Sequence, residues 1–475
     1  MHKYFSQFHH AHFTGIKGVG MTSTAQCLAD LGIAISGSDV ADDFVTAHIL
    51  KTVCSQVAVG FSPDHLMQEV DLVVYSGAHQ GSKNPEVEEA IRRGITTMSQ
   101  AEVLGKLMDG KRGVSVCGVG GKTTTSAMIS WILWKHQNNP SFSVGVGGIV
   151  GMERTGAYTE GNIFVAEADE YSIDPLVDRR PRFTYQHPEI IVCTNIFHDH
   201  PDIYPTYSDT LSAYNSFFSQ LSRSQSLIYF EDEKYSDDIK KMDFSCNLIT
   251  IGKSDSSTFS YDLSSYRIQP LLNQFSFSHE QRKYTVRVSV PGLFNIKNVL
   301  SAIATCSILG IPIEESIEYM QSFRGTVRRF EYKMRLLDSI DCYDDYAHHP
   351  SEILHTLKAL REWYPNARRV VVFQPHTYSR TKTLFHEFSH AFDDADVVII
   401  PPIFASAREG FDPSITSDQL VSALTSQGKL AFSPSSLDET VELLKELLTP
   451  NDVLMTIGAG DVYHLHDMIQ SAYAG

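Results

Sequence analysis

A glycine-rich segment that ends in a lysine, CGVGGKTTT at residues 117–125, is the first stretch whose residue types suggest chemistry. The preceding GVSV is typical of a strand, and the following TSAMISWIL is typical of a helix. Free backbone N–H groups and the helix dipole attract phosphate at such a junction. We therefore predict a nucleotide phosphate site formed by Gly118, Gly121, Lys122, Thr123 and Thr124.

The spacing of this segment is shorter than that of the common phosphate loop. Only Val119 and Gly120 separate the first glycine from the Gly-Lys pair, where the common pattern has four residues. The alternative is a tight turn with a solvated lysine. The strand–loop–helix context and the three threonines favour phosphate binding. Lys122 would then reach the terminal phosphates, and a hydroxyl of Thr123 or Thr124 would ligate Mg²⁺.

Acids and histidines follow two further strand-like runs, in VAEADEYSID and TNIFHDHPDIY. Functional groups gather beyond the carboxyl ends of strands in open parallel sheets. We therefore expect Glu167 and His200 to face the same crevice as Lys122 and to share Mg²⁺ there. Two alternatives stay open, namely turn-forming residues without chemistry, and a zinc site of His198 and His200 that no cysteine spacing supports.

GIKGVGM at residues 15–21, followed by Asp39 in SGSD, resembles the dinucleotide-binding fingerprint, although Lys17 replaces its middle glycine. A nucleotide-diphosphate group without nicotinamide would use the same physics. The predicted site consists of Gly15, Gly18, Gly20, Met21 and Asp39. The alternatives are a plain helix–strand turn and a nicotinamide-dependent oxidoreductase, which would leave the segment at 117–125 unexplained.

Four polar clusters mark the last third of the chain: RRFEY, DDYAHHPSE, FQPHTYSRT and SAREG. Guanidinium groups form two-pronged hydrogen bonds with carboxylate or phosphate. The candidate anion-binding arginines are Arg328, Arg329, Arg380 and Arg408. His348 and His349 are either site residues or ordinary turn residues.

Strand and helix patterns alternate through most of the chain, which predicts an α/β protein with parallel sheets and crossover helices. Length favours three domains, with predicted ranges of 1–110, 111–325 and 326–475. Residues 235–290 carry short alternating runs and are expected to form an antiparallel extension of the second sheet.

Composition restricts the classes of function. The 475 residues are 42% hydrophobic and 20% charged, as in ordinary soluble proteins, and the net charge of −17 disfavours nucleic-acid binding. There is no 18-residue apolar run and no signal-peptide pattern, so we expect a cytoplasmic protein without a membrane partner. Seven scattered cysteines argue against disulfides and zinc, and several are expected to be buried, inert thiols.

Together these motifs resemble the Mur ligase family of ATP-dependent amide-forming enzymes, whose phosphate loop has the short GxxGK[ST] spacing. The resemblance runs from GIKGVGM to GAGD at 458–461. It implies a Rossmann-like N-terminal domain that binds the UDP substrate, a central ATPase domain, and a Rossmann-like C-terminal domain that receives an amino acid. FQPHTYSRT and SARE are most similar to members that join L-alanine to UDP-N-acetylmuramate in peptidoglycan precursor synthesis.

The resemblance also implies roles for individual residues. Lys122 would hold the ATP phosphates, Thr123 and Glu167 would bind Mg²⁺, and His200 would act near the metal and the substrate carboxylate. The adenine and the rest of the nucleotide would be contacted by Asn295, Asn298, one of Arg328 and Arg329, and Asp345. The amino-acid side would be lined by His348, Arg380 and Arg408.

The implied reaction passes the γ-phosphate of ATP to the muramyl carboxylate, and the amine of L-alanine then attacks the acyl phosphate. Lysine, Mg²⁺ and arginine would offset the developing negative charge, and domain closure would exclude water. A monomer or weak homodimer is expected.

The chain departs from the family pattern at the phosphate loop, which usually reads GTHGKTTT but has Val119 and Gly120 here. No lysine matches the one that some members carbamylate. The nearest rival is the sister ligase that attaches a preformed tripeptide during cell-wall recycling. A binding module without catalysis is the other rival.

Overall fold

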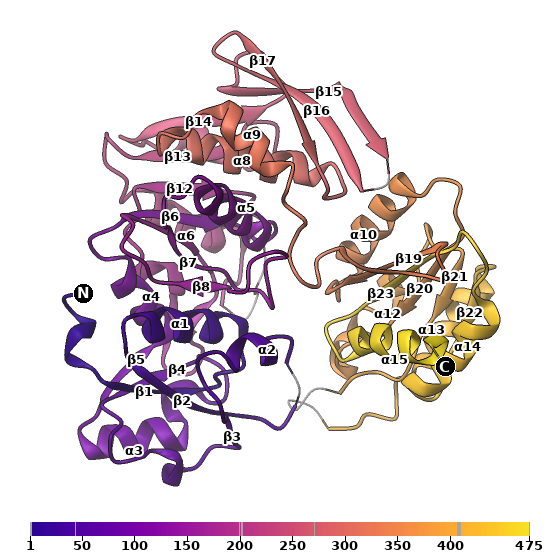
Figure 1. The fold of residues 1–475 in the computed structure, drawn as a ribbon, viewed down its shortest axis with the longest axis horizontal. Coiled ribbons are helices and arrows are strands. Elements are labelled where there is room, and N and C mark those ends of the chain that lie inside the picture. The colour runs from indigo at the N-terminus through magenta and orange to yellow at the C-terminus, as the bar shows by residue number, and fades with distance from the viewer. Residues whose placement is uncertain are drawn as a thin grey trace. The chain divides into compact units, whose positions relative to one another are not determined.

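The computed structural model describes residues 2–42, 44–198, 200, 203–269, 271–405 and 410–474. The chain divides into two compact units (Figure 1). Unit 1 comprises Met1–Tyr266, Gln274–Val288 and Phe294–Phe323, and unit 2 comprises Arg267–Asn273, Ser289–Leu293 and Arg324–Gly475. Unit 1 contains two of the large sheets, so the predicted boundary near residue 110 separates two sheets within one unit and stays a prediction.

The first sheet of unit 1 has five parallel strands in the order β3-β2-β1-β4-β5. Its strands are β1 His10–Thr14, β2 Ala34–Asp39, β3 Ala58–Val59, β4 Leu72–Tyr75 and β5 Thr96–Ser99. Its helices are α1 Val19–Asp30, α2 Ala47–Leu50, α3 Pro85–Arg93 and α4 Gln100–Met108. Leu72 and Val74 pack with α1 and α4, whereas Val73 faces the opposite side and packs with α3. This sheet, with helices on both faces, is the Rossmann-like fold predicted from the sequence.

Helix boundaries in this part follow side-chain caps. The side chain of Asn84 caps α3, Pro85 occupies the first helical position, and Gly94 ends the helix in a left-handed conformation. Ser99 and Glu102 form a capping box that starts α4.

The second sheet of unit 1 has ten strands in the order β17-β16-β15-β14-β13-β12-β6-β9-β7-β8. The strands are β6 Arg112–Cys117, β7 Ser141–Ser143, β8 Gly156–Ala157, β9 Ile163–Glu167, β12 Ile190–Cys193, β13 Ser226–Phe230, β14 Asn247–Gly252, β15 Phe259–Gln269, β16 Leu272–His279 and β17 Arg282–Val288. A separate hairpin is formed by β10 Ser172–Asp174 and β11 Asp178–Pro181. The helices are α5 Lys122–Lys135, α6 Tyr207–Phe218, α7 Ser236–Lys241, α8 Phe294–Ile308 and α9 Ile313–Met320. The central strands β12, β6 and β9 are parallel, so their carboxyl ends share one edge of the sheet.

The predicted antiparallel extension at 235–290 is wrong in its first steps. β14 pairs in parallel with β13, and β15 pairs in parallel with β14. The helix α7 lies between β13 and β14 in the chain and returns it to the same end of the sheet, which parallel pairing requires. Alternation of side chains identifies strands but does not encode their direction.

The two sheets of unit 1 are joined through α1, which contacts strands of both (Figure 1). The carboxamide oxygen of Gln26 accepts hydrogen bonds from the N–H groups of Thr155 (3.1 Å) and Gly156 (2.9 Å), and all three groups are buried. The hydroxyls of Ser23 and Ser143 lie 2.8 Å apart across the same junction. These buried polar contacts tie the two sheets into one unit.

Unit 2 contains a six-stranded sheet in the order β18-β19-β23-β20-β21-β22. Its strands are β18 Glu331–Leu336, β19 Ile340–Asp345, β20 Arg369–Phe373, β21 Val397–Ile399, β22 Leu430–Phe432 and β23 Val453–Ile457. Its helices are α10 Pro350–Trp363, α11 Tyr378–Thr383, α12 Phe385–Phe388, α13 Ser417–Ser426, α14 Leu437–Leu447 and α15 Leu465–Ala474. Only the edge pair β18–β19 is antiparallel among the described pairs. Separate apolar cores lie on the two faces, one with α10 and α13 and one with α14 and α15, as in the predicted Rossmann-like fold.

Among the described residues, no helix is long and apolar enough to cross a membrane. All seven cysteines are free thiols, and all but Cys246 are buried. Burial raises the pKa of the Cys27 and Cys306 thiols, as expected for inert thiols in an apolar core.

Candidate active site

The segment CGVGGKTTT forms a loop between the carboxyl end of β6 and the first turn of α5, as the sequence predicts. Gly118 (φ 121°) and Gly121 (φ 86°) both have left-handed backbones, which glycine alone adopts without strain. A Cβ atom at Gly118 would overlap the Thr194 hydroxyl and the Asn195 backbone. The loop is therefore closely packed on the segment that follows β12.

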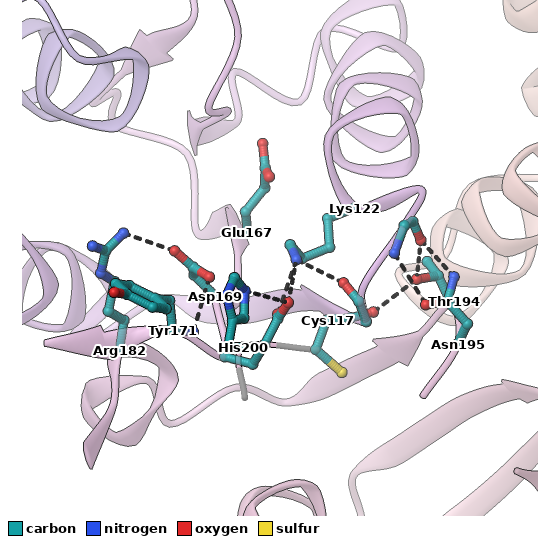
Figure 2. A network of polar contacts seen from close by, with 12 residues as sticks. Cys117, Lys122, Glu167, Asp169, Tyr171, Arg182, Thr194, Asn195 and His200 are labelled. Atoms are coloured by element: carbon teal, nitrogen blue, oxygen red, sulfur yellow. Dashed lines mark hydrogen bonds and ion pairs between the residues drawn. The ribbon is translucent and has the colours of Figure 1, made fainter. Parts of the chain in front are cut away.

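Thr194 and Asn195 hold the loop at Gly120. The Asn195 side chain accepts from the Gly120 N–H (3.0 Å) and donates to its carbonyl (2.8 Å), and the Thr194 hydroxyl donates to the same carbonyl (2.6 Å). Figure 2 shows both side chains beside the loop. The Thr194 and Asn195 side chains thus fix the loop through its backbone, although the side chains usual at positions 119 and 120 are missing.

Lys122 lies in the centre of the site with all three of its ammonium hydrogens engaged. Nζ donates to the Gly118 carbonyl (2.7 Å) and to both carboxylate oxygens of Glu170 (3.0 and 2.9 Å). Burial alone would lower the pKa of Lys122, but Glu170 and the neighbouring Asp169 raise it to about 12. The lysine is therefore a fixed positive charge at the helix N-terminus.

Glu167, the last residue of β9, faces the start of α5. Its carboxylate accepts from the Thr123 hydroxyl (3.0 Å) and from the Gly145 N–H (2.6 Å). Burial raises the pKa of Glu167. A hydroxyl and a carboxylate beside a phosphate loop are oxygen donors that suit Mg²⁺, which uses one or two carboxylates together with substrate phosphates and water. The residues present therefore fit the predicted metal.

Asp169 forms an ion pair with Arg182 and not with Lys122. Its carboxylate accepts from Arg182 (2.7 Å) and from the Tyr171 N–H (3.1 Å). Burial would raise the pKa of Asp169, but Arg182 and Lys122 hold it below its usual value. For Glu170, burial outweighs the attraction of Lys122 and raises the pKa. The cluster thus combines three acids with two basic side chains.

His200 joins this cluster, as predicted. Its Nε2 lies 3.9 Å from a carboxylate oxygen of Glu170, and its ring packs against Tyr171 at 4.8 Å (Figure 2). His198 is held by the carbonyl of Tyr204 (2.8 Å), which favours a structural role. Among the described residues, no set of three His, Cys, Asp or Glu side chains is placed to hold a metal ion.

Asn295 and Asn298 lie buried in the first turns of α8, which packs on α5. The Asn298 amide donates to the Asn295 side chain (2.9 Å), and its carboxamide oxygen borders Gly121. The structure therefore brings the two predicted nucleotide residues to the phosphate loop within unit 1. Thr124 is also there, in the first turn of α5.

The turn at residues 15–21 links β1 to α1. Gly15 has a left-handed backbone (φ 78°), and its N–H donates to the Ser38 carbonyl (2.9 Å). Gly18 precedes the helix, whereas Gly20 and the buried Met21 lie within its first turn. The Asp39 carboxylate is 1% exposed and accepts from the N–H groups of Lys17 (2.7 Å) and Val40 (2.8 Å). Asp39 thus holds the turn in place, and a contact with a ribose stays a prediction.

Arg328 and Arg329 in unit 2 differ sharply in their surroundings. Arg328 is 4% exposed and donates to the Asp344 carboxylate (3.0 Å) and to the carbonyls of Gly458 and Gly460. Arg329 is exposed. Arg328 (φ 61°) and Phe330 (φ 47°) both have left-handed backbones, so the chain turns sharply on either side of Arg329. Arg328 is an anchor, and Arg329 is presented to solvent.

Asp345 ends β19 next to this turn. Its carboxylate accepts from the N–H groups of Phe330 (2.7 Å) and Ala347 (2.8 Å). Burial raises the pKa of Asp345 to about 6, although Arg329 opposes the shift. Arg329 and Asp345 therefore form an adjoining pair at one end of the sheet.

His348 lies in the loop that follows β19, and Arg380 lies in α11, which follows β20. Burial lowers the pKa of His348, although Glu352 opposes the shift. Arg380 lies 3.2 Å from Nδ1 of His376, and the ring of His376 lies 6.5 Å from that of His348. The two predicted residues are thus close in unit 2. His349 caps α10, which supports the turn interpretation for it, and Arg408 lies outside the described residues.

Several residues that complete the site were not predicted from the sequence. Glu170 was available from the same EADE motif as Glu167, and Thr194 and Asn195 directly follow the β12 strand run. The N–H group of Gly145 offered no signal, because its role depends on a loop whose course the sequence does not reveal.

Three family models match the chain. They are described as Mur ligase family, catalytic domain (residues 10–112), Mur ligase middle domain (116–306) and Mur ligase, glutamate ligase domain (328–460). The chain belongs to the Mur ligase family.

Two full-length relatives, both named UDP-N-acetylmuramate–L-alanine ligase, give a finer comparison. The protein of Desulfitobacterium hafniense is 36% identical over 468 residues, covering 96% of this chain and 98% of the relative. The protein of Acetivibrio thermocellus is 37% identical over 468 residues, covering 98% of this chain and 96% of the relative.

Solved structures show the same architecture. The UDP-N-acetylmuramate–alanine ligase of Thermotoga maritima matches with a TM-score of 0.78 at 25% identity, over 98% of this chain and 99% of that one. A murein peptide ligase of Psychrobacter arcticus matches with a TM-score of 0.69 at 20% identity, over 98% and 99%, and supports the fold alone.

Proposed function

We propose that this protein joins L-alanine to UDP-N-acetylmuramate in peptidoglycan precursor synthesis, converting ATP to ADP and phosphate. The observation that carries the proposal is the phosphate loop, in which Lys122 and the Thr123–Glu167 pair meet at the start of α5. A nicotinamide-dependent oxidoreductase has no use for this loop. Relatives named for the alanine reaction match the chain at 36% and 37% identity over nearly its whole length.

In the proposed reaction, the substrate carboxylate takes the γ-phosphate of ATP and becomes an acyl phosphate. The amine of L-alanine attacks the acyl carbon, and the bond to phosphate breaks. The N–H groups of the loop and the Lys122 ammonium would bind the phosphates and stabilise the negative charge that develops there. Because the loop backbone is already packed on Thr194 and Asn195, it needs little rearrangement when nucleotide binds.

Mg²⁺ would be held by Thr123 and Glu167, with His200 nearby. When bound, the ion neutralises charge on the phosphate oxygens. Asn295 and Asn298 would contact the adenine, and Arg329 and Asp345 would contact nucleotide. The turn at residues 15–21 would bind the UDP substrate, and His348 and Arg380 would serve the amino acid. A cytoplasmic location and a monomeric or weakly dimeric state stay predictions.

Phosphate release from ATP in the presence of UDP-N-acetylmuramate tests the proposal. We expect release that depends on L-alanine and that Lys122→Ala abolishes, because the variant loses the charge at the phosphate site. The Lys122→Ala protein serves as the control for contaminating ATPases.

The other acceptors decide between the alternatives. Release with the preformed tripeptide and none with L-alanine would move the chain to cell-wall recycling. Absence of release with either acceptor would identify a binding module without catalysis.

A further inference from the structure

The Glu170 carboxylate and a nucleotide phosphate compete for the same lysine, Lys122. Both carboxylate oxygens accept from Lys122, and the third hydrogen of the ammonium is used by the Gly118 carbonyl. A phosphate oxygen can bind Lys122 only by taking the place of one of these acceptors. The Gly118 carbonyl belongs to the closely packed loop, so a Glu170 oxygen is the one that is displaced. Two anions side by side repel each other strongly where solvent is excluded, so the exchange separates Glu170 from Lys122.

Glu170 cannot retreat to solvent when Lys122 leaves it. The residue is 2% exposed, and its backbone carbonyl accepts from the Tyr204 hydroxyl at 2.6 Å, which fixes this part of the chain. A buried carboxylate without a cationic partner is costly. His200 Nε2, 3.9 Å from a Glu170 oxygen, is beyond hydrogen-bond distance, so the nucleotide-bound state requires a new cation in direct contact with Glu170.

The other two acids of the cluster have partners that nucleotide does not displace. Glu167 is held by Thr123 and by the Gly145 N–H, where it fits Mg²⁺. Asp169 is paired with Arg182 at 2.7 Å. Among the described acids of the cluster, Glu170 is the one whose basic partner also belongs to the phosphate site.

The amino-acid substrate brings the cation to this place. A free amino acid carries an ammonium group, and its nitrogen must reach the acyl carbon that forms beside the γ-phosphate. Lys122 marks the position of that phosphate, and the Glu170 carboxylate lies about one hydrogen bond away from the Lys122 nitrogen. We propose that Glu170 exchanges Lys122 for the ammonium group of the incoming amino acid when nucleotide binds, and thereby positions the amine. This role rests on the proposed ligase function.

Replacement of Glu170 by the nearly isosteric glutamine tests the exchange. The proposal predicts that this variant binds nucleotide more tightly and L-alanine more weakly. In Glu170→Gln, we expect ADP to bind about fivefold more tightly by calorimetry without magnesium, since no carboxylate competes for Lys122. We expect the KM for L-alanine to rise about 30-fold, because the ammonium loses a buried charged partner. Glu170→Asp should recover part of the affinity for L-alanine.

Asp169→Asn is the matched control, since it removes a carboxylate from the same loop but leaves the Lys122–Glu170 pair. It should not tighten ADP binding. A KM for L-alanine that stays unchanged in Glu170→Gln would overturn the proposal, as would weaker binding of both substrates, which indicates a structural role. A raised magnesium requirement with normal affinity for L-alanine would overturn it in favour of a metal ligand. Failure of the proposed function is seen separately, as a wild-type protein that releases no phosphate with L-alanine.

Discussion

At the scale of single residues, substitutions of the adjacent Arg328 and Arg329 are expected to have different effects, the first on folding stability and the second on nucleotide binding. Arg328→Ala leaves Asp344, which is 0% exposed, without its cation. Because removal of one partner from a buried ion pair costs about 3–5 kcal/mol, unit 2 should lose that much stability. Arg329→Ala should change stability by less than about 0.5 kcal/mol, as for most exposed positions. Hydrogen exchange of β19 amides at increasing denaturant concentration measures the unfolding free energy of unit 2 in each variant.

Kinetics of the exposed-site variant complete this comparison. If Arg329 contacts nucleotide, Arg329→Ala raises the KM for ATP about tenfold, the value of one charge-assisted hydrogen bond. Equal losses of stability in both variants, or a normal KM for ATP in Arg329→Ala, would contradict the division into anchor and ligand.

Asp345 makes the stability of unit 2 depend on pH. Burial raises its pKa from 3.8 to about 6. Between these values the folded state keeps a proton that the unfolded state has lost, so stability falls as pH rises through this window. Two pKa units correspond to about 3 kcal/mol.

The measurement compares the wild type with Asp345→Asn, which cannot titrate at this position. Relative to the variant, the wild type should lose about 2–2.5 kcal/mol of unfolding free energy between pH 4 and pH 7. A difference that stays constant over this range would mean that Asp345 titrates normally.

At the scale of elements, the loop between β6 and α5 depends on one glycine and tolerates change at another. Gly118 has φ 121°, and a Cβ atom there would overlap Thr194 and Asn195. Gly120 does not have a positive φ, and a Cβ atom there would have the Asn195 side chain as its nearest neighbour, at 3.6 Å. Because strain of about 3 kcal/mol corresponds to roughly 100-fold in rate, Gly118→Ala should lower kcat/KM for ATP by about that factor.

Gly120→Ala is the matched control and should stay within about threefold of the wild type, since it meets only ordinary contact distances. Steady-state phosphate release gives both ratios. Similar activity of the two variants would show that backbone shape at Gly118 does not limit nucleotide binding.

At the same scale, some features of the site and the sheets could be predicted from the sequence and others could not. Lys122, Glu167 and His200 were predictable, because each follows a strand and parallel strands end at a shared edge. The pairing of Lys122 with Glu170 was not, since it depends on which side-chain conformations fit together after folding. The direction of β14 was predicted wrongly, because the alternation of side chains is the same in parallel and antiparallel strands.

At the scale of the whole molecule, the grouping into two units predicts two unfolding transitions by calorimetry, although the chain has three large sheets. The first two sheets should melt together, because buried groups of one complete the hydrogen bonds of the other. Gln26 is the strongest case, as its carboxamide oxygen accepts from Thr155 and Gly156 inside the junction. Gln26→Met keeps a similar volume but leaves these buried N–H groups without an acceptor.

That substitution should cost about 2 kcal/mol and lower the melting temperature of the unit 1 transition by roughly 4 °C, or split the transition into two. The transition of unit 2 should stay in place. Arg154→Ala is the control at the same junction, because the Arg154–Asp30 pair is partly exposed and such pairs contribute about 0–1 kcal/mol. Three transitions in the wild type would mean that the N-terminal sheet folds on its own, and that its hydrogen bonds to the central sheet do not couple the two.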